Sequence, residues 1–154
     1  MRLALAQLNP LVGDLRGNAE QILAAVQQAE AEGAALVLTP ELSLWGYPPR
    51  DLLLQPARLA AQTDALDWLV HQMKGTCSLL VGVALPVDDH RSPGLFNGIA
   101  LVDRQGWRSV ARKQLLPSYD VFDERRYFRP GDGPCLLQLA DGARLGLTIC
   151  EDLW

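Results

Sequence analysis

The sequence predicts an α/β protein in which helices lie on one face of a mixed β-sheet. Three observations support this prediction. Apolar segments alternate with amphipathic, helix-length segments in the first half of the chain, a row of strand-like segments without helices follows, and an Asp-Gly turn joins the last two of these. The 154 residues, with 49% hydrophobic side chains, suffice for one domain with a sizeable core.

The first half of the chain is predicted to run strand, helix, strand, helix. Residues 3–8 and 35–39 are short apolar runs, as expected of strands that are buried on both faces. Between them, Asn18 can cap a helix that Gly33 ends. A second amphipathic helix is expected over residues 57–73. Since a helix connects the first two strands, we expect those strands to be parallel.

The second half of the chain is predicted to be mostly β-structure. Five strand-like runs follow the second helix: residues 79–85, 95–102, 107–116, 135–139 and 143–149. The last two flank Ala140-Asp141-Gly142, and Asp-Gly between apolar runs is typical of a β-hairpin. Because the strands do not alternate between apolar and polar residues, we expect the second face of the sheet to be apolar and to need a further layer.

Composition and charge argue against several classes of protein. The formal net charge is -4 and the basic residues are scattered, so a nucleic-acid-binding face is not expected. No apolar run approaches the roughly 18 residues of a membrane span. Cys77, Cys135 and Cys150 are widely spaced and form no metal-binding motif. We therefore expect a cytoplasmic protein with reduced thiols and without a metal site, which acts on small molecules or contacts other subunits.

Three reactive side chains follow predicted strands. Glu41 lies in TPELSLWGYPPRDLL, Lys113 in RKQLLPSYDVFDERRYF and Cys150 in LTICEDLW. Taken singly, each is more simply interpreted as a solvated charge or a buried thiol. Together they supply the base, the cation and the nucleophile that attack on an amide requires. His71 lies on the outer side of a predicted helix and His90 in a charged loop, and neither is beside the end of a predicted strand, so a glutamate rather than an imidazole is the expected base.

The order and contexts of Glu41, Lys113 and Cys150 resemble the nitrilase superfamily of carbon-nitrogen hydrolases, along the whole chain. Three sequence segments resemble, more narrowly, the glutaminase domain of glutamine-dependent NAD synthetases: GYPPRDLL, LPSYDVFDERRYF and ICEDLW. The resemblance implies a nitrilase-like αββα sandwich, of which residues 1–154 would be the first half to two-thirds. We therefore interpret the chain as a partial carbon-nitrogen hydrolase (glutaminase) domain, with the ATP-dependent synthetase domain absent.

The resemblance also implies a role for each site residue. Glu41 would be the general base, Lys113 would stabilise the oxyanion and Cys150 would be the nucleophile. Glu124 would orient the lysine, and the backbone N–H of Glu151 would be a second oxyanion donor. The implied substrate-binding residues are Tyr47, Tyr119, Phe122 and Glu151. For the three aromatic residues, packing in the core remains the alternative.

The implied activity is hydrolysis of L-glutamine to glutamate and ammonia through a cysteine thioester. In NAD biosynthesis the ammonia would pass to a synthetase domain, which would use ATP and Mg²⁺ to amidate nicotinic acid adenine dinucleotide. No cofactor is expected in this segment, no nucleic acid or membrane is an expected partner, and the complete enzyme is expected to be a homo-oligomer. Two alternatives remain open: a free-standing amidase or carbamoylase of the same superfamily, and a non-catalytic truncated remnant. We expect the isolated chain to be inactive.

Overall fold

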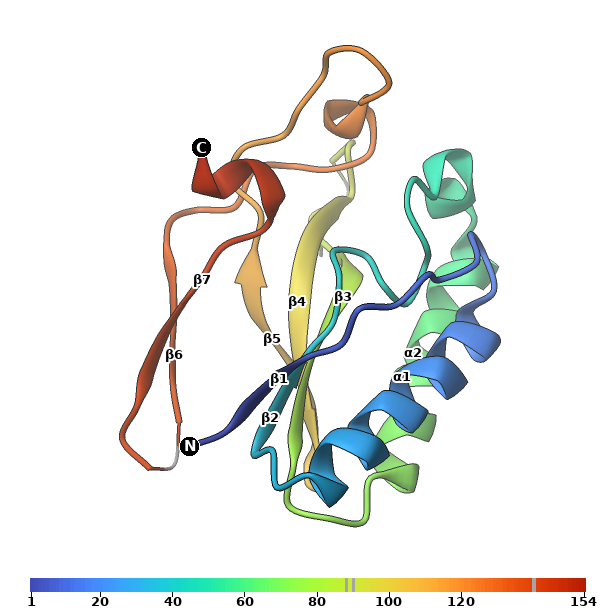
Figure 1. Cartoon of the computed structure of the whole chain (residues 1–154). Helices are drawn as coiled ribbons and strands as arrows, with labels where there is room; N and C mark the ends of the chain where they lie inside the picture. The colour runs from blue at the N-terminus through green and yellow to red at the C-terminus, as the bar shows by residue number, and fades with distance from the viewer. Residues whose placement is uncertain (88, 90, 140) are drawn as a thin grey trace.

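A five-stranded mixed sheet is the centre of the computed structural model, which describes residues 1–87, 89, 91–139 and 141–154 (Figure 1). Its strands, in spatial order, are β1 (Leu3–Leu5), β2 (Leu36–Leu38), β3 (Ser78–Pro86), β4 (Leu95–Asp103) and β5 (Gly106–Arg112). The first three are parallel, whereas β4 and β5 are antiparallel to their neighbours. The predicted α/β class and mixed sheet are confirmed. His90 and Ala140 lie outside the described residues.

Helices α1 (Leu15–Ala31) and α2 (Pro56–Gln72) cover one face of this sheet (Figure 1). The main core lies between the helices and the sheet, and its fully buried members include Ile22, Leu66, Leu69, Leu79 and Val81. Burial of each such aliphatic side chain contributes about 1.5–3 kcal/mol. The second predicted helix agrees with α2 to within one residue at each end, because its apolar side has a clear helical period.

The predicted start of the first helix at Asn18 is wrong. Asp14 is the N-cap, and its carboxylate accepts the N–H of Gly17 at 2.9 Å. Asn18 lies inside α1, where its buried side chain hydrogen-bonds both the N–H and the C=O of Leu11 and also donates to the C=O of Leu44. Asparagine suits both tasks, so local sequence could not separate a helix cap from a tertiary anchor.

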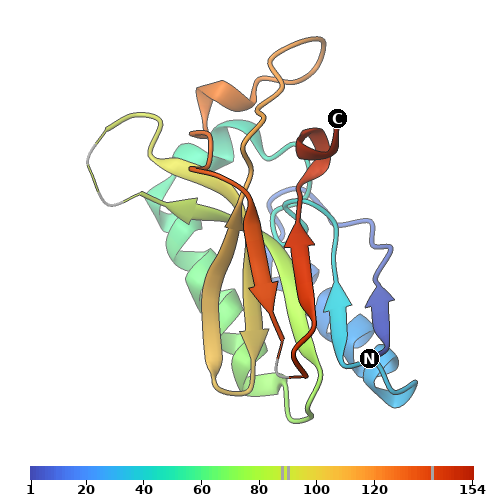
Figure 2. The same ribbon diagram turned by 90° about the vertical axis from the view of Figure 1, so that its left-hand side faces the viewer.

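The second face of the sheet carries an antiparallel hairpin of β6 (Cys135–Gln138) and β7 (Arg144–Leu147) (Figure 2). The predicted Asp-Gly hairpin is therefore confirmed. Six buried residues form a second, smaller core between the hairpin and the sheet: Leu36, Leu80, Leu101, Ala111, Leu137 and Leu147. The expected apolar second face exists, and this hairpin supplies part of the layer that covers it.

Several strands are shorter than the sequence suggests, and β1 and β5 are two of them. The strand predicted over residues 3–8 is only β1, and Leu3 and Leu5 are 38% and 69% exposed, because β1 lies beside the hairpin rather than under it (Figure 2). The strand predicted over residues 107–116 ends at Arg112. The N–H of Lys113 still bonds to the C=O of Asn97 in β4, but the N–H groups of Gln114 and Leu115 bond to a carboxylate instead of a neighbouring strand.

Candidate active site

The ends of three strands bring the reactive residues to one edge of the molecule. Strands β2, β5 and β7 run in the same direction, and their carboxyl ends lie at the same edge (Figure 2). Glu41 follows β2, Lys113 follows β5 and Cys150 follows β7. The structure places Glu41 in contact with Lys113, and Glu41 and Cys150 line the same small cavity.

Lys113 is a buried ammonium that lies between two carboxylates. Its Nζ donates to Glu41 Oε1 at 2.7 Å and to Glu124 Oε1 at 2.9 Å, and its side chain is 0% exposed. Burial by itself disfavours the charged form, but hydrogen bonds and charges from both glutamates outweigh burial and raise the pKa of Lys113 above its usual value. The ammonium therefore stays charged throughout the physiological pH range.

Glu124 has an environment that opposes ionisation. Burial raises its pKa, and so does the charge of Glu41, while hydrogen bonds from Lys113 and from the Tyr47 hydroxyl at 2.9 Å act in the opposite direction. The net shift of the pKa of Glu124 is upward. The pKa of Tyr47 is also raised, by its own burial and by the neighbouring carboxylate, so its phenol remains a donor.

Asn97 in β4 is a site residue that the sequence analysis missed. Its Nδ2 donates to Glu41 Oε1 at 2.6 Å, so this oxygen accepts from both Asn97 and Lys113. Among the described residues, no hydrogen bond involves the second oxygen, Oε2. Asn97 is fully buried, and no described residue pairs with its Oδ1. A lone polar residue inside the apolar run LFNGIALV is the signal that could have identified it.

The turn that carries Glu41 packs directly on β3 at Gly82. A Cβ atom at this glycine would lie 2.6 Å from the C=O oxygen of Pro40 and would also collide with the N–H of Leu42. The Gly82 C=O in turn accepts the N–H of Leu44 at 3.2 Å. Only glycine allows this approach of two backbones, and the approach sets the position of the turn.

Cys150 is an exposed residue at a sharp turn between β7 and the short 3₁₀ helix Cys150–Leu153. Its φ of 48° is in the left-handed region, which costs a non-glycine residue on the order of 1–3 kcal/mol. The cavity that it shares with Glu41 has a volume of about 130 Å³ and also includes Gly98 and Thr148. This turn therefore places Cys150 in the wall of that cavity.

The thiol of Cys150 is neutral at rest. Desolvation and the charge of Glu41 raise its pKa, while the charge of Lys113 and a hydrogen bond from the backbone N–H of Glu151 lower it by less. A cysteine with a raised pKa needs a base to become a nucleophile. Glu41 lines the same cavity and is the carboxylate available for that task.

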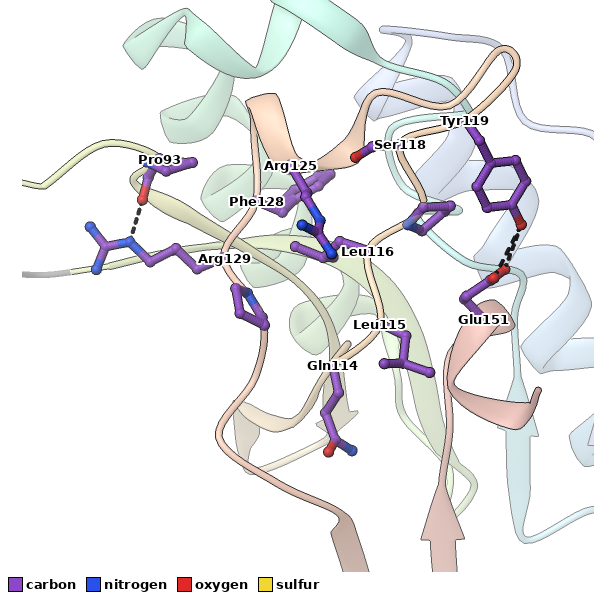
Figure 3. A pocket seen from close by; sticks show the side chains of 12 residues that line it. Pro93, Gln114, Leu115, Leu116, Ser118, Tyr119, Arg125, Phe128, Arg129 and Glu151 are labelled. Carbon is purple, nitrogen blue, oxygen red and sulfur yellow. Dashed lines mark hydrogen bonds between the residues drawn. The ribbon is translucent and has the colours of Figure 1, made fainter.

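The predicted substrate-binding residues form a chain of contacts. The ring of Phe122 lies 6.3 Å from that of Tyr47 and 5.6 Å from that of Tyr119, and the Tyr119 hydroxyl donates to the Glu151 carboxylate at 3.1 Å. Tyr119 is 53% exposed, so core packing is not its role. Tyr119 and Glu151 line a hollow of about 660 Å³ into which Arg125 projects (Figure 3). Tyr47 and Phe122 line a separate hollow of about 420 Å³.

Other expected features can be compared with the described part of the chain. There, no group of three or more His, Cys, Asp or Glu residues is arranged to hold a metal ion. Within the same residues, neither helix has the length and apolarity that crossing a membrane requires. The three cysteines are free thiols: Cys77 is buried, Cys135 is half-buried and Cys150 is exposed.

Comparisons with known proteins agree on one family. Residues 2–154 match the family model "Carbon-nitrogen hydrolase". Glutamine-dependent NAD(+) synthetases from Synechocystis sp. and Aquifex aeolicus are 43% and 40% identical to the chain over 99% and 100% of its length. The match covers 28% and 26% of those proteins, so the chain spans little more than a quarter of the relatives' length.

Solved structures show the same fold. A glutamine-dependent NAD⁺ synthetase from Acinetobacter baumannii superposes with a TM-score of 0.86 at 32% identity, over 99% of this chain and 28% of that one. A variant of an amidase from Nesterenkonia sp. AN1, with the acetamide moiety of fluoroacetamide covalently added at its active-site cysteine, superposes with a TM-score of 0.78 at 28% identity, over 99% of this chain and 56% of that one. The sheet and helices are thus a partial nitrilase-type domain, and the chain belongs to the carbon-nitrogen hydrolase family.

Proposed function

We propose that residues 1–154 belong to the glutamine-hydrolysing part of a glutamine-dependent NAD synthetase. The names of the similar proteins support this substrate and this product. The observation that carries the proposal is the buried Lys113 ammonium, which lies 2.7 Å from Glu41 and 2.9 Å from Glu124, together with the cavity that Glu41 and Cys150 both line. A buried, permanently charged cation next to a neutral thiol and a carboxylate is suited to acyl transfer from an amide.

The first half of the reaction forms a thioester. Glu41 Oε2 takes the thiol proton as Cys150 Sγ attacks the side-chain carbonyl carbon of glutamine. The negative charge that develops on the carbonyl oxygen is stabilised by Lys113 Nζ and the Glu151 N–H. When the tetrahedral intermediate collapses, protonated Glu41 gives its proton to the departing nitrogen, and ammonia leaves.

The second half of the reaction uses water. Glu41 removes a proton from a water molecule, the resulting hydroxide attacks the thioester carbon, and the proton returns to the Cys150 sulfur as glutamate leaves. Glu41 is neutral for part of each half-reaction and then holds Lys113 less strongly. Glu124 contacts the same ammonium at 2.9 Å and would keep it in place during those steps.

Glu151 and the aromatic residues are proposed to bind the glutamine backbone and side chain. The Glu151 carboxylate lies next to the nucleophile in sequence, and it accepts a hydrogen bond from Tyr119 at the rim of the larger hollow. A carboxylate in this place suits the α-ammonium group of an amino acid. Tyr47 and Phe122, from the adjoining hollow, are proposed to extend the pocket wall, since the Phe122 ring contacts the rings of both Tyr119 and Tyr47.

The remaining steps are assigned to parts of the enzyme beyond this segment. There, ammonia would meet nicotinic acid adenine dinucleotide that ATP and Mg²⁺ have activated. The three free thiols support a reducing, cytoplasmic location. We also propose that the complete enzyme is a homo-oligomer.

Covalent labelling tests the proposed nucleophile without requiring turnover by the chain. We expect a chloroketone analogue of L-glutamine to alkylate Cys150, because the ketone replaces the scissile amide and the chloride leaves. Peptide mass spectrometry separates this site from Cys135, the half-buried thiol that serves as an internal control. Labelling should be faster with the L-analogue than with its D-isomer, and Glu41→Gln should slow it. Equal labelling of Cys150 and Cys135 would contradict the proposal.

A free-standing amidase is the second candidate, because the chain also superposes on the Nesterenkonia amidase. The two candidate functions use the same nucleophile and differ in the substrate. Labelling of Cys150 by fluoroacetamide but not by the glutamine analogue would favour the amidase. Absence of labelling by either compound would favour the non-catalytic remnant.

A further inference from the structure

We propose that Asp152 is a positioning residue that sets the nucleophile Cys150 against Lys113. The inference rests on the proposed function, since it concerns the geometry of the same site. Asp152 lies in the 3₁₀ turn that begins at Cys150, and its carboxylate contacts two separate segments of the chain. It does not touch the reacting atoms.

The Asp152 carboxylate accepts three backbone N–H groups. Oδ1 accepts from Gln114 at 2.9 Å and from Leu115 at 2.8 Å, and Oδ2 accepts from Ile149 at 3.2 Å. Gln114 and Leu115 follow Lys113 directly, and Ile149 immediately precedes Cys150. One carboxylate therefore joins the residue after the cation to the residue before the nucleophile.

This connection matters because the two segments belong to different sheets. Lys113 follows β5 of the five-stranded sheet, whereas Cys150 follows β7 of the separate hairpin. Apolar packing holds the hairpin on the sheet, and packing alone tolerates small sliding movements. Among the described residues, the hydrogen bonds from residues 148–154 to the chain outside the hairpin are those of Asp152 and the exposed Tyr119–Glu151 pair.

The same carboxylate also explains where β5 ends. Residues 114 and 115 could have continued the strand, but their N–H groups point to Asp152 instead. The chain therefore leaves the sheet directly after Lys113. A charged acceptor is suited to this place, because hydrogen bonds to a carboxylate are shorter and stronger than those to a neutral oxygen.

Loss of this anchor should change the chemistry of Cys150. The charge of Lys113 and the N–H of Glu151 are the two groups that lower the pKa of Cys150, and both are placed by segments that Asp152 holds. In Asp152→Ala the pH midpoint for iodoacetamide alkylation of Cys150 should rise by about half a unit or more. Labelling by the chloroketone analogue should slow on the order of tenfold, since the sulfur and its oxyanion donors lose their alignment.

Asp152→Asn and Asp103→Asn provide the matched comparison. The first variant keeps Oδ1 for Gln114 and Leu115 but loses the charge and the acceptor for Ile149, so it should shift the pH midpoint less than alanine does. Asp103 likewise accepts a turn N–H, from Gln105 at 2.8 Å, in the β4–β5 turn at the other end of the sheet. Asp103→Asn should therefore leave the pH profile of Cys150 unchanged.

The outcomes separate this inference from the proposed function. If Cys150 of the unmodified chain does not react with the analogue, the proposed function fails. If it does react, and Asp152→Asn and Asp152→Ala have the same pH midpoint as Asp103→Asn, the positioning role of Asp152 is overturned. Should the alanine variant lose its cooperative unfolding transition, Asp152→Asn decides alone: an unchanged pH midpoint and labelling rate overturn the inference.

Discussion

Removal of the Lys113 ammonium should destabilise the fold strongly. In Lys113→Met, an apolar side chain of similar length replaces a cation that is 0% exposed and that contacts Glu41 and Glu124. The two carboxylates would then face each other without a cation between them. Breaking a buried charge pair by removing one partner costs about 3–5 kcal/mol. For a domain of this size each kcal/mol lowers the Tm by about 2–4 °C, so the expected loss is about 6–20 °C.

The destabilisation should depend on pH in a defined direction. Without its ammonium partner, Glu124 should have a pKa raised further above the usual glutamate value, since burial and the charge of Glu41 remain. The folded state then binds a proton more tightly than the unfolded state, so stability is lost as pH rises through the folded-state pKa. The difference in Tm between Lys113→Met and the unmodified chain should therefore be smaller at about pH 5 than at about pH 8.

Thermal unfolding followed by circular dichroism measures this effect. Lys74→Met is the matched control, because Lys74 is the only other lysine and is exposed. Adding Glu124→Gln to Lys113→Met should restore part of the lost Tm by removing one of the opposed charges. A Tm of Lys113→Met within about 2 °C of the Lys74→Met control would show that the buried ammonium does not stabilise the fold.

Three further changes test other parts of the structure. Asn97→Leu removes a donor to Glu41 and should slow chloroketone labelling of Cys150 on the order of tenfold; an unchanged rate would show that Lys113 alone orients the carboxylate. Gly82→Ala should lower the free energy of unfolding in denaturant by about 1–3 kcal/mol, whereas Gly146→Ala, whose Cβ meets open space, should not; equal effects would contradict the close packing of the Glu41 turn. Leu5→Lys should reduce fluorescence of an apolar-surface dye, because Leu5 is 69% exposed on the uncovered part of the sheet; unchanged fluorescence would mean that this surface is not accessible to the dye.

Some elements of the fold could be predicted because their signals are local. The apolar period of α2 and the Asp-Gly turn between β6 and β7 each depend on a few neighbouring residues, and both predictions agree with the structure. The predicted start of α1 was wrong because the Asn18 side chain does not cap the helix but donates hydrogen bonds to the C=O groups of Leu11 and Leu44. The exposure of Leu5 could not be predicted from the local sequence either, since it depends on the position of a hairpin that is distant in the sequence.

Some residues of the candidate site could likewise be predicted from the sequence, and others could not. Glu41, Lys113 and Cys150 could be selected because each follows a strand and because their contexts resemble one family. Asn97 and Asp152 were not predicted as site residues, since an amide in a strand and a carboxylate in a turn can serve many structural roles. Their partners are Glu41 and the backbone beside Lys113, both far away in the sequence.

The sequence by itself determined the α/β class, the order of most elements and the three reactive side chains, because short-range periodicity and motif context carry that information. Only the tertiary structure decided that Glu41 and Glu124 share one ammonium and that Asp152 connects the turn at Cys150 to the end of β5. The physical reason is that hydrogen bonds and charge pairs act over a few ångströms. Residues far apart in the chain come within that range only after the hairpin and the sheet have packed together.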